Sequence, residues 1–213
     1  KMALRSFIDN LKINFKEIKN KTNNSIPNPQ LHIVSKKSEQ CSIMLGKLLP
    51  NKTHNEYHKI SITNALFGGY FGSRLMQNIR EEKGWTYGIH SSIINYQDAT
   101  ALVISADVLK NKGDETINEI EKEIRRLQTD LISEEELNTL RNYLKGTLLK
   151  GFDGAFEQVD RFFSVDSFGL SWSYYDQYIE TLESITPEEI KQTAIQYLNW
   201  EDFVRVKVGG QNV

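Results

Sequence analysis

The spacing of hydrophobic and polar residues along the chain changes between two periods, and each period predicts one kind of element. Apolar residues at every second position, as in Cys41, Ile43 and Leu45, are typical of a strand with one buried face. Segments of this kind predict strands at residues 31–34, 41–46, 85–96, 100–108 and 203–208. The turn between the third and fourth strands is expected within residues 95–99.

Apolar residues three and four positions apart predict helices over much of the rest of the chain. Three of these helices are expected to begin with a capping box, in which a Ser or Thr hydroxyl and a Glu three residues later satisfy each other's backbone N–H groups. The boxes are Thr53 with Glu56, Ser133 with Glu136, and Thr186 with Glu189. The first helix should run to about residue 67 and the second to about 149, while residues 117–127 and 156–163 predict two more.

A glycine-rich stretch, residues 68–72, is expected to break the helix that begins at Thr53. Ser73 should cap a further helix that runs to about residue 83, and Gly84 should end it. Residues 1–21 show helical spacing and are interpreted as a helix from the preceding part of a longer chain. Residues 22–29 are rich in turn formers and indicate a linker.

Residues 30–213 are then expected to form one domain. The order of elements is strands, helices, hairpin, helices and a final strand, which predicts an α+β fold with a mainly antiparallel sheet and helices packed on one face. The 213 residues include 26 Lys and Arg against 28 Asp and Glu, so no strong positive field favours nucleic acid. No apolar run approaches the ~18 residues of a membrane span. Bacterial cytoplasm and periplasm both stay open.

His54 and His58 are four residues apart in a predicted helix, a spacing with which helices present two ligands to zinc. The segment is neither His-Glu-x-x-His nor His-x-x-Glu-His, the arrangements that also supply a general base. Two solvated histidines in the first turns of a helix are the favoured alternative. Cys41, the single cysteine, lies in an alternating strand and is interpreted as a core residue rather than a nucleophile.

Arg80 and Tyr87 are seven residues apart, one near the end of a predicted helix and the other early in the following strand. A guanidinium and a phenol are donors suited to a peptide carbonyl or to the oxyanion formed when it is attacked. The alternative is that Arg80 pairs with Glu81, Glu82 or a helix-end carbonyl, and that Tyr87 is a half-buried strand aromatic. The glycines of 68–72 allow either a joint with positive φ angles or a backbone that a peptide can approach.

The run NALFGGYFGSRLMQNIREEKGWTYG, residues 64–88, resembles the C-terminal domain of pitrilysin/insulinase-type zinc peptidases. That family includes insulin-degrading enzyme and the mitochondrial processing peptidase subunits. The resemblance continues through residues 133–146, 185–190 and 204–210, and so covers roughly residues 30–213 in matching order. It implies α+β units whose two halves close around a peptide.

The resemblance implies that zinc belongs to another domain or subunit, because the family's inverted motif, His-x-x-Glu-His, is absent here. It also implies that Arg80 and Tyr87 bind the substrate carbonyl, and that Gly68, Gly69 and Gly72 lie in a substrate-contacting loop, here shorter than in the processing peptidase. The expected partners are a peptide substrate and a zinc-bearing domain or subunit of the same family, with which the chain forms a dimer. The rival expectation is a structural or assembly subunit without a peptidase role.

Overall fold

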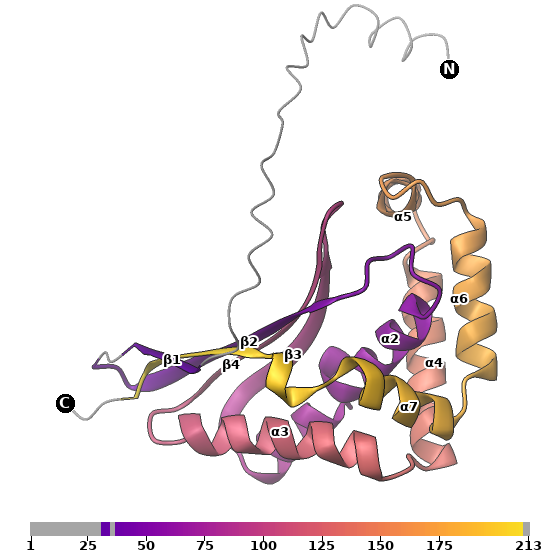
Figure 1. Ribbon diagram of the computed structural model, residues 1–213. Coiled ribbons are helices and arrows are strands. Elements are labelled where there is room, and N and C mark those ends of the chain that lie inside the picture. The colour runs from indigo at the N-terminus through magenta and orange to yellow at the C-terminus, as the bar shows by residue number, and fades with distance from the viewer. Residues whose placement is uncertain (1–30, 35–36, 211–213) are drawn as a thin grey trace, which may run out of the picture.

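The protein forms one five-stranded sheet with its helices gathered mainly on one face, as a computed structural model describes it for residues 31–34 and 37–210 (Figure 1). The strands follow the order β1-β5-β2-β4-β3, in which β1 and β5 are parallel and all other neighbours antiparallel. Their bounds are β1 Leu31–Val34, β2 Gln40–Leu49, β3 Thr86–Asn95, β4 Thr100–Leu109 and β5 Val204–Gly209. The predicted α+β class is confirmed.

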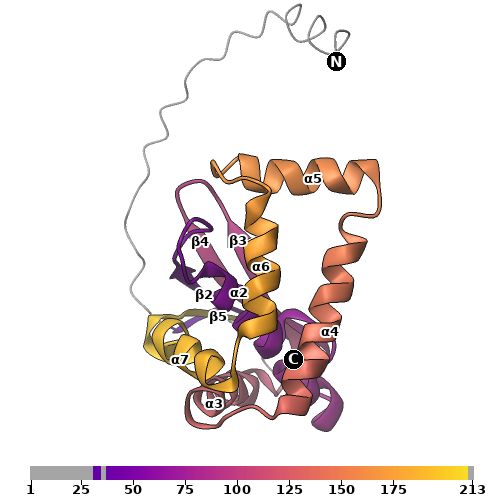
Figure 2. The same cartoon turned by 90° about the vertical axis from the view of Figure 1, so that its right-hand side faces the viewer.

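The helices form two groups around the sheet. Helices α2, α3 and α7 lie beside the sheet, whereas α4 and α6 stand at one end of it and α5 lies across their upper ends (Figure 2). None of the helices in the described part of the chain is long and apolar enough to cross a membrane. The bounds are α2 Tyr57–Asn64, α3 Gly113–Thr129, α4 Glu134–Lys150, α5 Ala155–Asp166, α6 Ser173–Ser184 and α7 Pro187–Tyr197.

Strand β2 shows the alternation that the sequence predicts. Cys41, Ile43 and Leu45 are buried, and Leu45 lies opposite Ile104 of β4. The intervening Met44 and Leu48 are exposed on the other face of the sheet. Because side chains alternate between the two faces of a strand, β2 divides the molecule into a helix-covered side and an uncovered side.

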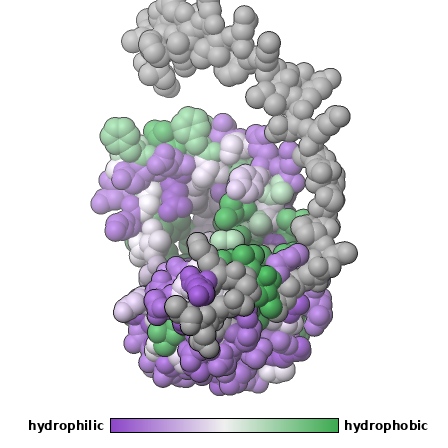
Figure 3. Space-filling model, turned by 90° about the vertical axis from the view of Figure 1, so that its left-hand side faces the viewer, coloured by the Kyte–Doolittle hydropathy of each residue, from purple (hydrophilic) through white to green (hydrophobic). Residues whose placement is uncertain are grey.

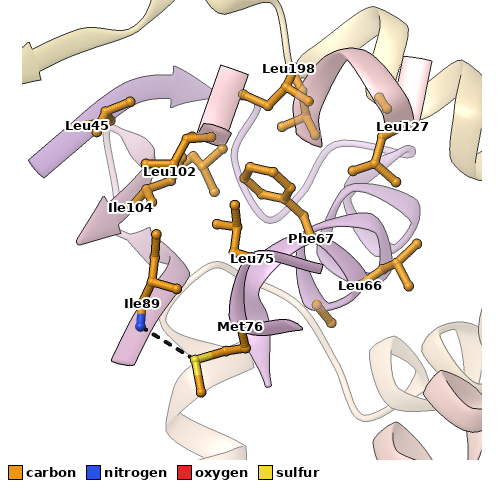
Figure 4. Close-up of a cluster of buried hydrophobic side chains, with 14 of the residues drawn as sticks. Leu45, Leu66, Phe67, Leu75, Met76, Ile89, Leu102, Ile104, Leu127 and Leu198 are labelled. Atoms are coloured by element: carbon orange, nitrogen blue, oxygen red, sulfur yellow. Dashed lines mark hydrogen bonds between the residues drawn. The ribbon is translucent and has the colours of Figure 1, made fainter. Parts of the chain in front are cut away.

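The core lies between the sheet and the helices on its covered face. Phe67 and Leu75 point toward Leu102 and Ile104 of β4, and all four side chains are fully buried (Figure 4). Burying a side chain of this size stabilises the fold by roughly 1.5–3 kcal/mol. In the same cluster the backbone N–H of Ile89 donates to Met76 Sδ over 3.5 Å, which places β3 directly against the segment that carries Met76.

In two of the three predicted capping boxes the Ser or Thr hydroxyl accepts from the backbone N–H of the Glu three residues later. Only one of these two boxes also has the return bond from the Glu carboxylate. Thr186 and Glu189 form the full reciprocal box, with distances of 3.2 and 3.1 Å. The Ser133 hydroxyl accepts from the Glu136 backbone, but the Glu136 carboxylate binds the Arg74 guanidinium instead of reaching back. A charged partner from another element therefore outcompetes the local backbone bond.

The capping box predicted at Thr53 is wrong. Helix α2 begins at Tyr57, and both the backbone N–H and the hydroxyl of Thr53 bond to the side chain of Asn51. The Glu56 backbone N–H donates to His54 Nδ1, and its carboxylate lies 3.6 Å from Lys59. Local side-chain bonds thus stabilise a turn where the sequence pattern predicts the first turn of a helix.

The glycine-rich stretch ends the helix as predicted, although at Gly69 rather than at about residue 67. Helix α2 continues as a π-helix, η1, over Ala65–Gly69, and a second π-helix, η2, covers Met76–Glu82. Gly68, Gly69 and Gly72 all have ordinary φ angles, which excludes a joint with positive φ angles at these three glycines, one of the two alternatives. The Ser73 hydroxyl is buried and caps nothing within the described residues, whereas Gly84, with φ +64°, ends η2 as predicted.

Candidate functional site

Tyr87 projects from a bulge at the start of edge strand β3. Thr86 pairs with Val108 and Ile89 with Ala106, so Tyr87 and Gly88 together face the single residue Asp107. An extra residue of this kind bends the strand and re-aims a side chain. The Tyr87 side chain is 93% exposed, which excludes the alternative of a half-buried strand aromatic.

The bulge is held by the hydroxyl of Thr86. This hydroxyl donates to the carbonyl of Asp107 over 2.6 Å, and it accepts from the backbone N–H of Gly88 over 3.1 Å. Side-chain to backbone bonds satisfy groups that the interrupted ladder leaves without strand partners. These bonds of Thr86 therefore fix the backbone position of Tyr87.

Arg80 lies in the last turn of η2, where a cation interacts favourably with the helix C-terminus. Its guanidinium stacks over the Phe71 ring, 4.5 Å from the centroid, and bonds to Glu81 Oε1 over 2.5 Å. The pairing with Glu81 agrees with one of the two alternatives for Arg80. The contacts of the structure do not join Arg80 to Tyr87; each stands at its own end of the turn that contains Gly84.

Gly68 is the glycine of the predicted loop that packs most tightly. A Cβ at this position would lie 2.6 Å from Ser91 Cβ and 3.0 Å from the Ser91 backbone nitrogen, both on β3. Gly72 is enclosed differently, because a Cβ there would meet the Tyr70 ring at 2.7 Å. The two glycines therefore allow close packing, and Gly69 follows Gly68 at the end of η1, next to the extended residue Tyr70.

The uncovered face of the sheet is a shallow hollow of about 560 Å³. Seen from the end of the sheet that β1 and β5 form, hydrophobic side chains gather above a hydrophilic lower surface (Figure 3). The hollow combines apolar and polar side chains across four strands, including Met44, His90, Ser105, Asp107, Val206 and Val208. Gly88 of the Tyr87 bulge also lines it, so the bulge opens onto this face.

The two histidines at helical spacing do not form a metal site. His54 precedes α2, and its Nδ1 accepts from the Glu56 backbone. His58 is buried against the rings of Tyr174 and Tyr178, and burial followed by the nearby Lys52 lowers its pKa to about 4. Within residues 31–34 and 37–210 no three His, Cys, Asp or Glu side chains come together as ligands. This donor set does not fit zinc.

Cys41 is a core residue. Its thiol is buried, and burial raises its pKa more than the nearby Lys207 lowers it. A protonated, enclosed thiol is a poor nucleophile. The interpretation of Cys41 as a packing residue therefore agrees with its surroundings.

The sequence matches the family described as "Peptidase M16 inactive domain" over residues 3–144, which is more than half of the 213-residue chain. The chain belongs to this family. Curated relatives of this M16 inactive domain include an uncharacterized zinc protease of Mycobacterium leprae, 25% identical over 177 residues, and one of Bacillus subtilis, 25% identical over 168 residues. The alignments cover 80% and 79% of this chain but 38% and 41% of those proteins.

Solved structures share the fold. An M16 inactive domain of Pseudomonas fluorescens aligns with a TM-score of 0.80 and 23% identity, over 89% of this chain and 45% of that one. A chain of complex III2 from Candida albicans aligns with a TM-score of 0.69 and 18% identity, over 85% of this chain and 46% of that one. The family match over residues 3–144 confirms the resemblance seen in residues 64–88, and the M16 inactive domain spans less than half of the length of these curated relatives.

Most of the residues that line the uncovered face of the M16 inactive domain carry no motif that identifies them in the sequence. His90 and Asp107 belong to different strands and share no motif with each other or with Val206. The alternation within each strand indicates which side chains are exposed. It does not indicate which exposed residues of different strands lie next to one another. The same holds for Lys52 and Arg161, two cations that the sequence analysis did not single out.

Proposed function

We propose that this M16 inactive domain binds the peptide substrate of a zinc metallopeptidase whose zinc is held by another domain or subunit. The observation that supports this most directly is Tyr87, which is 93% exposed on a bulge beside the hollow of the sheet. A large aromatic residue in that position has no packing role. It is, however, well placed to donate a hydrogen bond to a bound molecule.

The side chains of Arg80 and Tyr87 carry hydrogen-bond donors that suit the carbonyl oxygen of an acyl group. A phenol O–H and a guanidinium N–H both donate hydrogen bonds, and the guanidinium keeps its charge at any physiological pH. Donors fixed beside a scissile carbonyl stabilise the negative charge that develops on its oxygen in the transition state. In this proposal Arg80 and Tyr87 supply such donors, and the zinc-bearing partner supplies the activated water.

The contacts of Arg80 are compatible with a second partner. Its bond to Glu81 joins two partly exposed side chains, and exposed ion pairs of this kind are worth only about 0–1 kcal/mol. Stacking on Phe71 holds the guanidinium plane without using its N–H groups. Several of the five donors of Arg80 therefore remain available to a substrate.

Two surfaces of the domain can bind the peptide: the outer edge of β3 and the hollow of the uncovered face. Strand β3 is an edge strand, so its outer backbone groups can pair with an extended peptide by strand addition. The hollow offers Met44 and Val206 to apolar side chains of such a peptide. Gly68 is buried against β3, whereas Gly69 at the end of η1 and Gly72 next to Phe71 are exposed, so in this proposal the backbone of these two exposed glycines borders the peptide near Arg80.

The test uses the assembled peptidase, with the zinc-bearing domain or subunit present. R80A and Y87F should each lower kcat/KM by about 100-fold, the usual effect of removing one oxyanion donor. Zinc content, measured by metal analysis, should not change, since this chain supplies no zinc ligand in the proposal. Unchanged turnover in both variants would contradict the assignment.

Two substitutions on the same chain serve as matched controls. Tyr96 is another exposed tyrosine of the β3–β4 hairpin, and Arg125 is an exposed arginine of α3 that pairs with Glu121. Y96F and R125A remove the same chemical groups away from Arg80 and Tyr87. Both should retain full activity, so a loss in either would point to a general effect on folding.

A structural or assembly role is the second candidate, and the likeness to a chain of complex III2 favours it. In that role the domain would bind a partner chain without contributing to hydrolysis. Pull-down with tagged protein distinguishes the two functions. A zinc-bearing partner whose activity depends on Tyr87 supports the substrate-binding role, whereas stable assembly with Y87F and unchanged activity supports the structural one.

A further inference from the structure

A second cavity lies among the helices, on the opposite side of the sheet from the hollow described above. It is partly open to solvent, has a volume of about 180 Å³ and is lined by α2, α4, α5, α6 and the loop that precedes α2. In Figure 2 these are the elements gathered beneath α5, where it crosses from α4 to α6. The substrate-binding role proposed above uses none of its residues.

The cavity contains two cations and no acidic side chain. Lys52 enters from the loop before α2 and Arg161 from the middle of α5. Lys52 Nζ donates to the carbonyl of Ser164 over 2.8 Å, and the Arg161 guanidinium lies 5.9 Å from the centre of the Phe152 ring. Among the residues that the structure describes, neither cation forms an ion pair with a carboxylate.

Two neighbouring cations without an opposite charge destabilise the protein when no ligand is bound. Burial lowers the pKa of Lys52, and the positive charge of Arg161 lowers it further. The Ser164 carbonyl belongs to the last turn of α5, where the helix dipole offsets only part of one positive charge. Rings of Phe168 and Tyr174 add cation–π contacts to Lys52, at 5.7 and 5.0 Å, which are weak compared with an opposite charge.

The polar groups that face these cations are also donors. The hydroxyls of Tyr174 and Tyr178 have no hydrogen-bond partner in the described part of the chain, whereas that of Tyr175 donates to the Arg161 carbonyl. Burial raises the pKa of Tyr178 to about 12 and that of Tyr174 still further. Both phenols therefore stay protonated, so they can donate to an anion and cannot neutralise the cations.

The size and walls of the cavity limit the anion. A void of about 150 Å³ accommodates a benzene ring, so 180 Å³ is enough for a small organic molecule. Leu144 and Leu148 of α4 and the tyrosine rings of α6 provide apolar surface around the polar groups. A ligand with one anionic group and a ring-sized body matches both features.

We propose that this cavity binds a small organic anion, with its carboxylate or phosphate between Lys52 and Arg161. The hydroxyls of Tyr174 and Tyr178 donate to the same oxygens, and the body of the ligand lies against the tyrosine and leucine walls. Such a ligand supplies the negative charge that the surrounding side chains lack. Charge-assisted bonds of this kind are the strong ones in proteins.

Isothermal titration calorimetry with four probes tests the proposal on the whole chain. Phenyl phosphate, benzoate, inorganic phosphate and acetate separate the two head groups and show whether a ring adds affinity. At least one aromatic probe should bind saturably with one site per chain, and more tightly than its ringless counterpart. Absence of saturable binding by any probe up to about 10 mM would overturn the proposal.

Substitutions then locate the binding. K52M/R161L should weaken it by at least about tenfold, and Y174F or Y178F by several fold, since each removes a bond to a charged group. K122M/R125L removes the same charges from the exposed face of α3 and should bind like the wild type. Equal affinity in K52M/R161L would also overturn the proposal. The tyrosine variants break no bond in the described fold, so they keep the test valid if the double variant does not fold.

Proton uptake provides an independent readout. The groups that face Lys52 are Arg161 from α5, His58 and Tyr57 from α2, and Tyr174 and Tyr178 from α6. A bound anion beside Lys52 should raise its pKa, so binding at alkaline pH takes up protons. The binding enthalpy should then vary with the ionisation enthalpy of the buffer in the wild type and not in K52M. No such dependence at any alkaline pH would contradict contact between the anion and Lys52.

Discussion

Gly68 shows how one missing side chain determines a close contact between elements. A methyl group at this position would collide with the side chain and backbone of Ser91 and with Leu75. G68A should therefore lower the free energy of unfolding by about 2 kcal/mol, in the range typical of overpacking. Urea denaturation of the purified chain measures this change.

Gly146 offers the matched control. It lies within α4, and a Cβ there would meet no heavy atom within 4 Å. G146A should raise the free energy of unfolding by about 0.5–1 kcal/mol, because alanine loses less backbone entropy in a helix. If G68A were as stable as G146A, the tight packing of η1 on β3 would be wrong.

His58 makes the stability of the protein depend on pH. Burial, followed by Lys52, lowers its pKa to about 4 in the folded state from an ordinary value of 6.5. The unfolded chain therefore binds more protons between these values, and stability that is complete above pH 6.5 falls as the pH decreases toward 4. The loss should be on the order of 2 kcal/mol, since partial solvent contact reduces the effect of the full shift.

The His58 effect can be measured by urea denaturation at several pH values. H58F should flatten the slope between pH 4 and 6.5, because the ring stays in its aromatic surroundings but no longer binds a proton. H90Q changes an exposed histidine on β3 and should leave the slope in place. A slope that persists in H58F would assign the acid sensitivity to other groups.

Helix caps are the features of single elements with the clearest energetic consequence. Thr186 forms a complete capping box at the start of α7, whereas Thr53 bonds only to Asn51 in a turn. T186A should therefore lower the free energy of unfolding by about 1 kcal/mol. T53A should lower it by less, and equal losses would indicate that a helix begins at Thr53 after all.

The sequence predicted ordinary helix in the segments of η1 and η2, and no local pattern predicted that they would be π-helical. η1 ends at Gly69, and η2 carries Arg80 in its last turn. Short π-helical segments are rare and often lie at functional sites. Here they flank the turn that brings Phe71 to Arg80. This placement is consistent with a role for Arg80 beyond its pairing with Glu81.

In the whole molecule, the sheet separates two candidate binding regions. The hollow, with Gly88 of the Tyr87 bulge, belongs to the uncovered face, whereas Lys52, Arg161 and their tyrosines lie among the helices. Helix α5 contributes to the second region from one side and exposes Phe156 and Phe163 on the other. The two regions share no residue, so their variants should act independently.

Much of the candidate site was accessible from the sequence, but only through the family resemblance. The residues alone favour a local pairing of Arg80 and a half-buried Tyr87, and only the family resemblance favours a role in binding. Tyr87 is exposed because of the bulge at Thr86–Ile89, and a bulge depends on the register against β4. Register is a property of two strands together, so no pattern within one strand indicates it.

The sequence by itself determined the strands, most of the amphipathic helices and the complete cap at Thr186, because these follow from interactions between residues close together in the chain; helix α6 was not predicted. The tertiary structure decided which contacts override local preference, as where Arg74 captures Glu136. It alone brought Lys52 to Arg161, which is more than a hundred residues away in the sequence. Such pairs form because burial of the hydrophobic core fixes the positions of whole elements. The free energy gained by that burial outweighs the repulsion between two like charges that are brought close together.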